Sequence, residues 1–195
     1  MKRILIFLVM IPGILEAQDK GIGLEMEGSY GVLSSAQILT VTRDVFVEII
    51  TLGTVVDKQN YHSTGPGFLS ARYYVKSWLG VGLAFGMDII KADLVNEEDQ
   101  IIGDYVYRSQ VIAAEFKFRY LNTEFIQMYS GLGSGYRFGK EKTRHLDDPP
   151  DESYAGLWAG HINLVGIRIG KGFGGFLELG YGYKGIFNVG FSCNF

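Results

Sequence analysis

The chain has 195 residues, of which 18 are Lys or Arg and 21 are Asp or Glu, so its formal net charge of −3 excludes a basic nucleic-acid-binding protein. Its single cysteine, Cys193, excludes an internal disulfide and a cysteine cluster for zinc. The chain is rich in Gly (27), Phe (13) and Tyr (12), and its apolar residues alternate with small or polar ones, which indicates strands rather than helices.

The first residues, MKRILIFLVMIPGILEAQ, have the pattern of a secretory signal. Lys2 and Arg3 precede an apolar run that closes on Ala17, and this run is shorter than the ~20 residues of a transmembrane helix. We therefore expect residues 1–17 to be a cleaved signal peptide and residues 18–195 to be one mature domain. The alternative is an uncleaved anchor. Since no cysteine follows the run directly, a lipoprotein is not expected.

Eight segments of the mature chain have the alternation of a β-strand. In WLGVGLAFGMDI, every second side chain from Leu79 to Ile89 is apolar, and the intervening residues are Gly, Ala or Asp. A slip by one residue would exchange the two faces, so the register is strongly specified. Long polar linkers are expected at 34–63, 92–104 and 139–154. The predicted strands are approximately 21–33, 64–75, 78–91, 105–120, 125–138, 155–169, 173–182 and 185–195.

One stretch of the first long linker has a different period. In SSAQILTVTRDVFVEIITLG, Ile38, Val41, Val45 and Ile49 recur at spacings of three and four. This spacing predicts a short amphipathic helix at 35–52. The many Val, Ile and Thr residues also fit a β-hairpin, which would raise the number of strands from eight to ten.

The two faces of the predicted strands indicate a membrane protein. One face is continuously apolar and aromatic, whereas the other mixes Gly and Ala with full charges. A sheet in lipid must close, because hydrocarbon offers no hydrogen-bond partners to the backbone N–H and C=O groups of an open edge strand. We therefore predict an all-β fold, a closed antiparallel eight-stranded transmembrane β-barrel with an apolar outside and a polar lumen. A soluble carrier with an apolar lumen is the competing interpretation. The charged side chains expected in the lumen are Glu25, Glu27, Arg72, Asp88, Glu115, Lys117, Arg119, Arg137, Arg168 and Glu178.

The chain ends within its clearest strand, GIFNVGFSCNF, on an aromatic residue. Through Asn188, Gly190, Cys193 and Phe195 this strand resembles the C-terminal strand of small outer-membrane β-barrel proteins of Gram-negative bacteria, in particular Bacteroidetes-type ones. Cys193 is a weak departure from the family pattern, which has an apolar residue there. The resemblance covers the whole mature chain. It implies an outer-membrane location and an assembly signal at these four residues, read by the barrel-assembly machinery.

The expected lumen has the composition of a plug. An eight-stranded barrel is just wide enough to be filled by its own side chains, and equal numbers of inward acids and bases favour a self-neutralised plug over a water-filled pore. His62, His145 and His161 lack a paired nucleophile and orienting acid, so catalysis is not expected. The acidic segments 96–100 and 145–152 indicate solvated loops without a calcium-binding spacing. Neither a cofactor nor a metal site is expected.

These observations predict a monomeric outer-membrane barrel with a filled polar lumen and a structural or surface-interaction role. The resemblance implies three partners: outer-membrane lipid, lipopolysaccharide and the barrel-assembly machinery. Two alternatives stay open, a narrow transporter or channel for small or apolar solutes and a lipid A-modifying enzyme.

Overall fold

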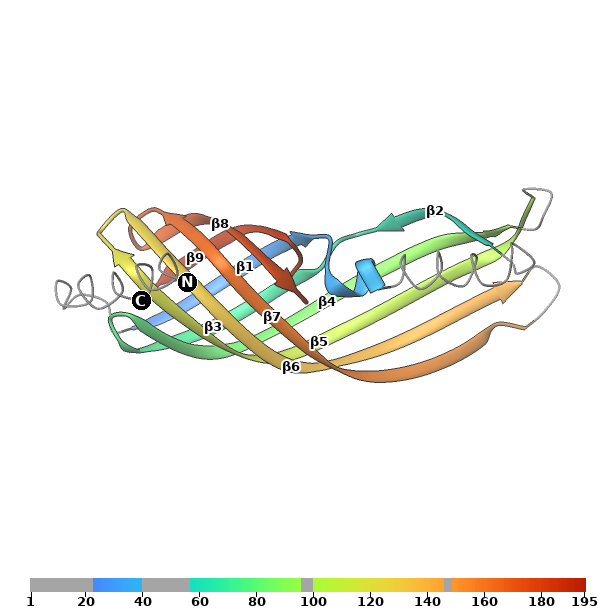
Figure 1. Ribbon diagram of the computed structural model, residues 1–195, viewed down its shortest axis with the longest axis horizontal. Coiled ribbons are helices and arrows are strands. Elements are labelled where there is room, and N and C mark those ends of the chain that lie inside the picture. The colour runs from blue at the N-terminus through green and yellow to red at the C-terminus, as the bar shows by residue number, and fades with distance from the viewer. Residues whose placement is uncertain (1–22, 40–56, 96–99, 146–148) are drawn as a thin grey trace, which may run out of the picture.

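The computed structural model of the chain describes residues 23–39, 57–95, 100–145 and 149–195, and it consists almost entirely of antiparallel strands (Figure 1). The expected signal peptide lies outside the described residues. The strands are β1 (Leu24–Val32), β2 (Asp57–Ser63), β3 (Gly67–Lys76), β4 (Leu79–Val95), β5 (Ile101–Asn122), β6 (Ile126–His145), β7 (Asp151–Ile169), β8 (Phe173–Gly182) and β9 (Phe187–Asn194).

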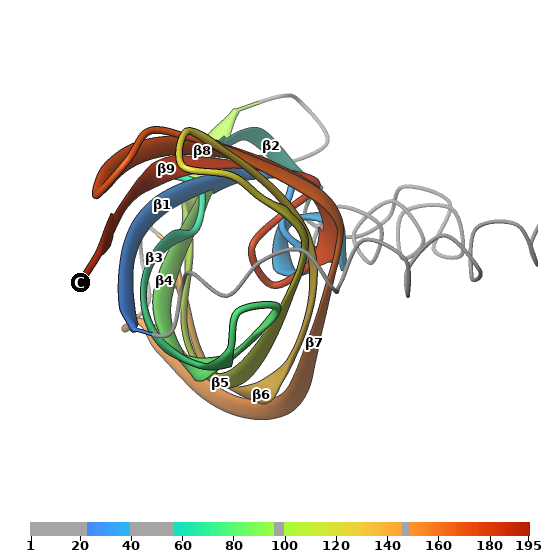
Figure 2. The ribbon, with the colours of Figure 1, turned by 90° about the vertical axis from the view of Figure 1, so that its left-hand side faces the viewer.

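Eight of these strands form a closed ring (Figure 2). The order runs β1, β3, β4, β5, β6, β7, β8 and β9, and β9 then pairs with β1, from Glu25 opposite Asn194 to Val32 opposite Phe187. The predicted eight-stranded barrel is therefore confirmed, and the alternative of ten strands is wrong. The short β2 lies outside the ring, since it pairs only with the part of β4 that β3 does not reach.

A short helical segment follows β1. Residues 35–39 are helical, and the Ser34 side chain accepts a hydrogen bond from the backbone N–H of Gln37 at 3.2 Å, as a helix cap does. The rest of the predicted helix at 35–52 lies outside the described residues.

The barrel is apolar on its outside and polar on its inside. Along β3 and β8, buried and exposed residues alternate, and the exposed ones are largely apolar. Leu69 is 69% exposed, Leu83 64% and Phe191 64%. A soluble protein would bury such residues, whereas a barrel in lipid presents them to the acyl chains. The chain is thus a transmembrane β-barrel, and the soluble-carrier interpretation is wrong. Among the described residues, no helix has the length and hydropathy to cross a bilayer.

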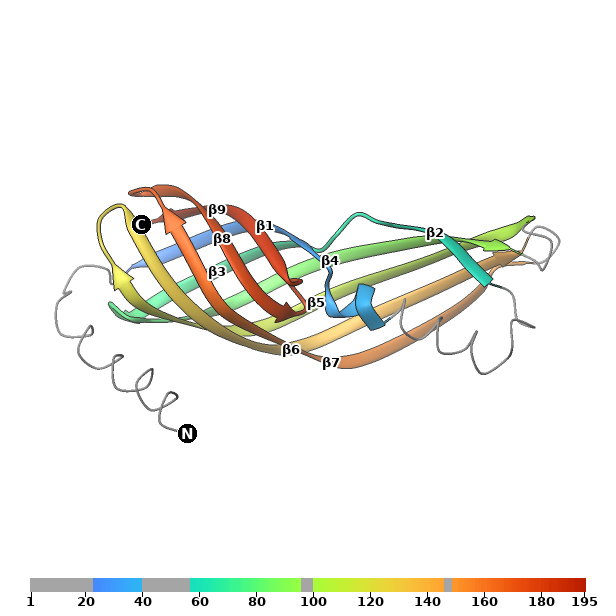
Figure 3. The ribbon, with the colours of Figure 1, turned by 45° about the horizontal axis from the view of Figure 1, so that its top comes forward.

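Four neighbouring strands continue far beyond the ring (Figures 1 and 3). β8 and β9 have 10 and 8 residues, close to the ~9–11 that cross a bilayer, whereas β5 and β6 have 22 and 20. We call the parts of β4–β7 that project past the ring the extension; it points away from the end where β1 begins and β9 ends.

The extension corrects the expected linkers at 92–104 and 139–154. Much of both is strand, because Leu94 pairs with Gly103 and Lys142 pairs with Glu152 in a regular ladder. The increase in polarity along these segments marks where the strands leave the lipid rather than where the sheet ends.

Candidate functional site: a charge network in the lumen

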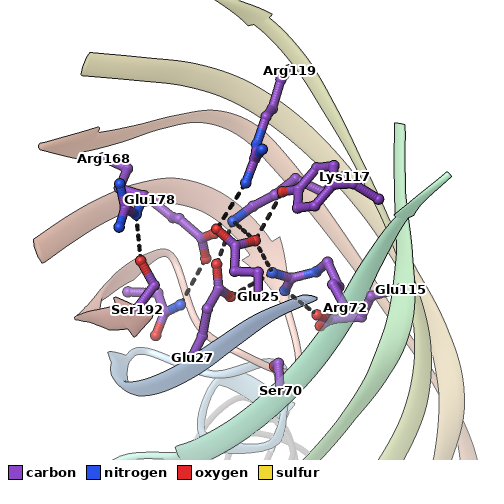
Figure 4. A network of polar contacts seen from close by, with 12 residues as sticks. Glu25, Glu27, Ser70, Arg72, Glu115, Lys117, Arg119, Arg168, Glu178 and Ser192 are labelled. Carbon is purple, nitrogen blue, oxygen red and sulfur yellow. Dashed lines mark hydrogen bonds and ion pairs between the residues drawn. The ribbon is translucent and has the colours of Figure 1, made fainter. Parts of the chain in front are cut away.

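Two carboxylates from β1 form the centre of a buried network (Figure 4). Glu25 and Glu27 are two residues apart on one strand, so both side chains enter the lumen. Arg72 on β3 places Nη1 3.2 Å from Glu25 Oε2 and 2.7 Å from Glu27 Oε2. Its Nη2 lies 2.6 Å from Glu115 Oε2 on β5. One guanidinium therefore bridges three carboxylates.

Two further bases from β5 complete this group. Lys117 contacts Glu27 and lies 3.0 Å from Glu25, and its ammonium sits 3.9 Å from the centre of the Tyr129 ring. Arg119 donates to Glu25 at 3.1 Å, and its guanidinium stacks 3.4 Å over the ring of Tyr74. Charges taken out of water are tolerated when they are paired in this way.

All ten charged residues predicted for the lumen are at most 5% exposed, but they do not form a single network. Arg168, at the β7–β8 turn, donates to Ser192 and to the backbone carbonyls of Gly170 and Lys171 at 2.7 and 2.8 Å. Glu178 accepts a hydrogen bond from Asn188 at 2.7 Å. These two charged groups hold turns and neighbouring strands rather than each other.

The remaining two predicted residues lie toward the extension. Asp88 accepts a hydrogen bond from the Ser34 hydroxyl at 2.7 Å, and Arg137 donates to the Ser35 hydroxyl at 2.8 Å. Both therefore bind the start of the helical segment and fix it over this end of the lumen. The ion-paired set is thus Glu25, Glu27, Arg72, Glu115, Lys117 and Arg119.

Sequence reasoning missed two members of the network, because they lie in a turn. Tyr183 donates to Glu115 at 2.8 Å, and Lys184 Nζ lies 2.7 Å from the same carboxylate. Gly182 and Gly185 flank them with φ of 138° and 104°, values that favour glycine and let the turn fold back into the lumen. Turn residues are usually exposed. The available signal was the GYKG segment, where the alternation of the last two strands breaks.

The packed lumen leaves little free space at the level of the network. A cavity of about 20 Å³ lies among residues that include His161, Asn163, Glu178 and Lys184. A single water molecule needs about 10–15 Å³ measured in this way, so this cavity is far too small for a solute. Within the described residues, no three His, Cys, Asp or Glu side chains are grouped to hold a metal ion.

Glycines make room for the large side chains of the lumen, and Gly133 offers a test of this. Gly133→Ala is expected to lower the free energy of unfolding by about 1–3 kcal/mol, because the added methyl would overlap the Tyr183 hydroxyl. Urea titration of the barrel refolded in micelles measures this change. Gly160→Ala is the matched control, since a methyl there meets no atom within 4 Å. Equal stabilities of the two variants would contradict the overlap.

The residues expected to form the assembly signal lie on both faces of β9. Asn188 and Gly190 face the lumen, where Asn188 binds Glu178 and Gly190 packs against Phe176. Phe195 is 75% exposed, and its backbone exchanges hydrogen bonds with Leu24 at 2.8 and 3.2 Å. Cys193 is partly buried on the same outer face. Whether the assembly machinery reads these four residues stays a prediction.

No family model and no curated protein matches the chain. Among solved structures it is similar to Ail, the attachment invasion locus protein of Yersinia pestis, with 14% identity and a TM-score of 0.43, covering 88% of this chain and 95% of that one. Ail in complex with the heparin analogue sucrose octasulfate gives 13% identity and a TM-score of 0.41, covering 88% and 96%. Similarities at these scores carry no argument about function.

Proposed function

We propose that the chain is a monomeric outer-membrane protein whose barrel is a sealed anchor and whose extension is a surface for interactions outside the cell. The observation that carries this proposal is the contrast within one sheet. The ring is filled by ion-paired side chains at the height of the bilayer, while β4–β7 continue well beyond it. A structural or surface-interaction role uses both parts, and no catalytic step is part of it.

The orientation follows from the two ends of the barrel. Leu24 and Phe195, which pair at one end of the β1–β9 seam, lie at the same end of the barrel as the short turn at 170–172, where Asn194 donates to Gly172. In outer-membrane barrels the short turns are periplasmic and the longer connections face outward. The resemblance of β9 to Gram-negative, Bacteroidetes-type barrels supports the same location, after export by the signal peptide and insertion by the barrel-assembly machinery.

The sealed lumen is tested by conductance. We expect the refolded protein to give no discrete conductance steps in a planar bilayer, because Arg72, Lys117 and Lys184 are held by carboxylates across the lumen. A porin in the same bilayer serves as the positive control. Stable steps from the purified barrel would contradict the plug and favour the narrow transporter.

The outward position of the extension is tested separately in intact cells. Tyr154 is 73% exposed near the start of β7, in the extension. Tyr154→Cys in a Cys193→Val background, which keeps an apolar residue at that site of β9, should therefore react with a membrane-impermeant maleimide added outside. Lys171→Cys, at the opposite end of the barrel, is the matched control and should react only after the outer membrane is opened. The reverse pattern would invert the orientation.

A further inference from the structure

Basic side chains gather on the outer face of the extension. The rim is the set Lys91, Arg108, Lys140, Lys142 and Arg144 on β4, β5 and β6. The ladder brings them together: Arg108 pairs with Lys140, and Val106 pairs with both Lys91 and Lys142. The formal net charge of the chain is −3, so a local cluster of five bases is not what the overall composition predicts.

The rim begins where the apolar wall of the barrel ends. On β6, Tyr136 and Phe138 face outward, and Lys140 and Lys142 follow at the next two positions of the same face. The rings of Tyr136 and Phe138 are 5.0 Å apart, and the ring of Trp158 lies 6.3 Å from that of Tyr136. Such an aromatic cluster marks a membrane–water interface. The rim therefore begins at headgroup depth. Along β6, Lys140 lies about 7 Å of strand beyond Phe138, and Arg144 lies about 20 Å beyond it.

The rim has fewer acids than bases. Glu152 lies 2.8 Å from Lys140 and 3.6 Å from Lys142, and these pairs are more than a third exposed, so water screens them and they contribute little. Among the residues that the structure describes, the other acids on this face are Asp93 and Asp104. Five bases against three acids leave this described part of the rim positive, and a cleft of about 130 Å³ opens between Val106, Arg108, Lys140, Lys142 and Glu152.

We propose that the rim binds the phosphate groups of lipid A in the outer leaflet, a partner that rests on the proposed outer-membrane orientation. A phosphate has several acceptor oxygens, and Lys and Arg form short charge-assisted hydrogen bonds with it. The apolar wall and aromatic rings directly below the rim receive the acyl chains of the same molecule. This continuity of a basic rim with an apolar wall fits a membrane-anchored phosphate better than a free one.

The experiment compares lipids in detergent micelles with the refolded barrel. Trp158 lies in the aromatic cluster below the rim, opposite Tyr136, where the acyl chains would lie. Its fluorescence in a Trp78→Phe background therefore reports binding of bisphosphorylated lipid A. The combined variant Arg108→Gln, Lys140→Gln, Lys142→Gln should bind about 10-fold more weakly. Lys76→Gln with Lys171→Gln, which removes bases from the periplasmic end, should bind like the parent. Glu152→Gln should bind about 3-fold more tightly, because it removes a competing acid.

Each further result decides the proposal. Equal binding of lipid A and its dephosphorylated form, or parental binding by the combined variant, would overturn it. Inorganic phosphate at millimolar concentration should leave the fluorescence unchanged, and competition by it at that level would assign the site to free phosphate instead. If the combined variant fails to fold, two single variants test the proposal instead. Lys142→Gln should bind lipid A more weakly than the parent, and Glu152→Gln should bind it more tightly. Conductance by the barrel would overturn the sealed anchor without affecting this result.

Discussion

Arg72→Ala is expected to lower the free energy of unfolding of the refolded barrel by about 3–5 kcal/mol, the range for removing one partner of a buried ion pair. Arg72 is 3% exposed, and its guanidinium contacts Glu25, Glu27 and Glu115 together. Its loss leaves the three buried carboxylates with the lysines of β5 and the last turn and, for Glu25 alone, with Arg119. Urea titration in micelles, followed by tryptophan fluorescence, measures the change.

Three variants set the scale for this result. Arg108→Ala removes an exposed arginine outside the network and should change stability by less than about 0.5 kcal/mol. Arg119→Ala removes the partner of a single carboxylate and should cost about 3 kcal/mol. Arg72→Lys keeps the charge but cannot bridge three carboxylates, so it should lie between Arg72→Ala and the parent. A loss below about 1 kcal/mol for Arg72→Ala would mean that water reaches these carboxylates.

Phe195→Asp is expected to reduce the amount of barrel in the outer membrane of cells about 10-fold or more while leaving refolding in detergent nearly normal. The side chain is 75% exposed, so in the folded barrel a charge there costs only about 0–1 kcal/mol near the membrane boundary. The ring closes through the backbone of this residue and Leu24, which the substitution leaves intact. A selective loss in cells therefore reports recognition during assembly.

Phe173→Asp is the matched control for that experiment. Phe173 lies next to β9 at the same end of the barrel, pairs with Cys193, and stacks on Phe191 at 5.6 Å. It carries the same new charge at the same boundary but lies outside the C-terminal strand. Both variants failing equally in cells would make the effect one of membrane packing. Normal accumulation of Phe195→Asp would remove the main support for the assembly signal.

Within the membrane the sequence was a good guide, because lipid imposes a strict rule on alternate residues. β8 occupies 173–182, as its alternation predicts, and Arg168 and Glu178 are buried as their positions require. Beyond the membrane that rule lapses. In the extension the apolar residues lie on the inner face, where Ala92, Leu94 and Tyr105 are buried together, and charged residues such as Lys91 lie on the outer face. The alternation therefore changes phase where the strands leave the lipid, and the pairing between β5 and β6 continues past that point.

The details of the network depend on neighbours that the alternation does not specify. Periodicity assigns Glu115 to the lumen, but its contacts with Arg72 and Lys184 depend on ring closure and on the path of the last turn. Arg168 illustrates the same limit. The alternation of β7 predicts that the Arg168 side chain is buried in the lumen. Its three carbonyl partners in the β7–β8 turn depend on local backbone geometry, which the alternation does not specify.

The inward fold of the β8–β9 turn sets an order of events for the growing chain. Glu25 and Glu27 arrive on the first strand, but Tyr183 and Lys184 arrive with the final hairpin. Until that hairpin is in place, Glu115 lacks two of its three partners, and the edges of β1 and β7 are open. A sheet in this state would expose both an incompletely paired acid and unpaired backbone groups to hydrocarbon. The seam therefore closes and the interior charges are neutralised in the same step, and a barrel without its last hairpin is unstable in the bilayer.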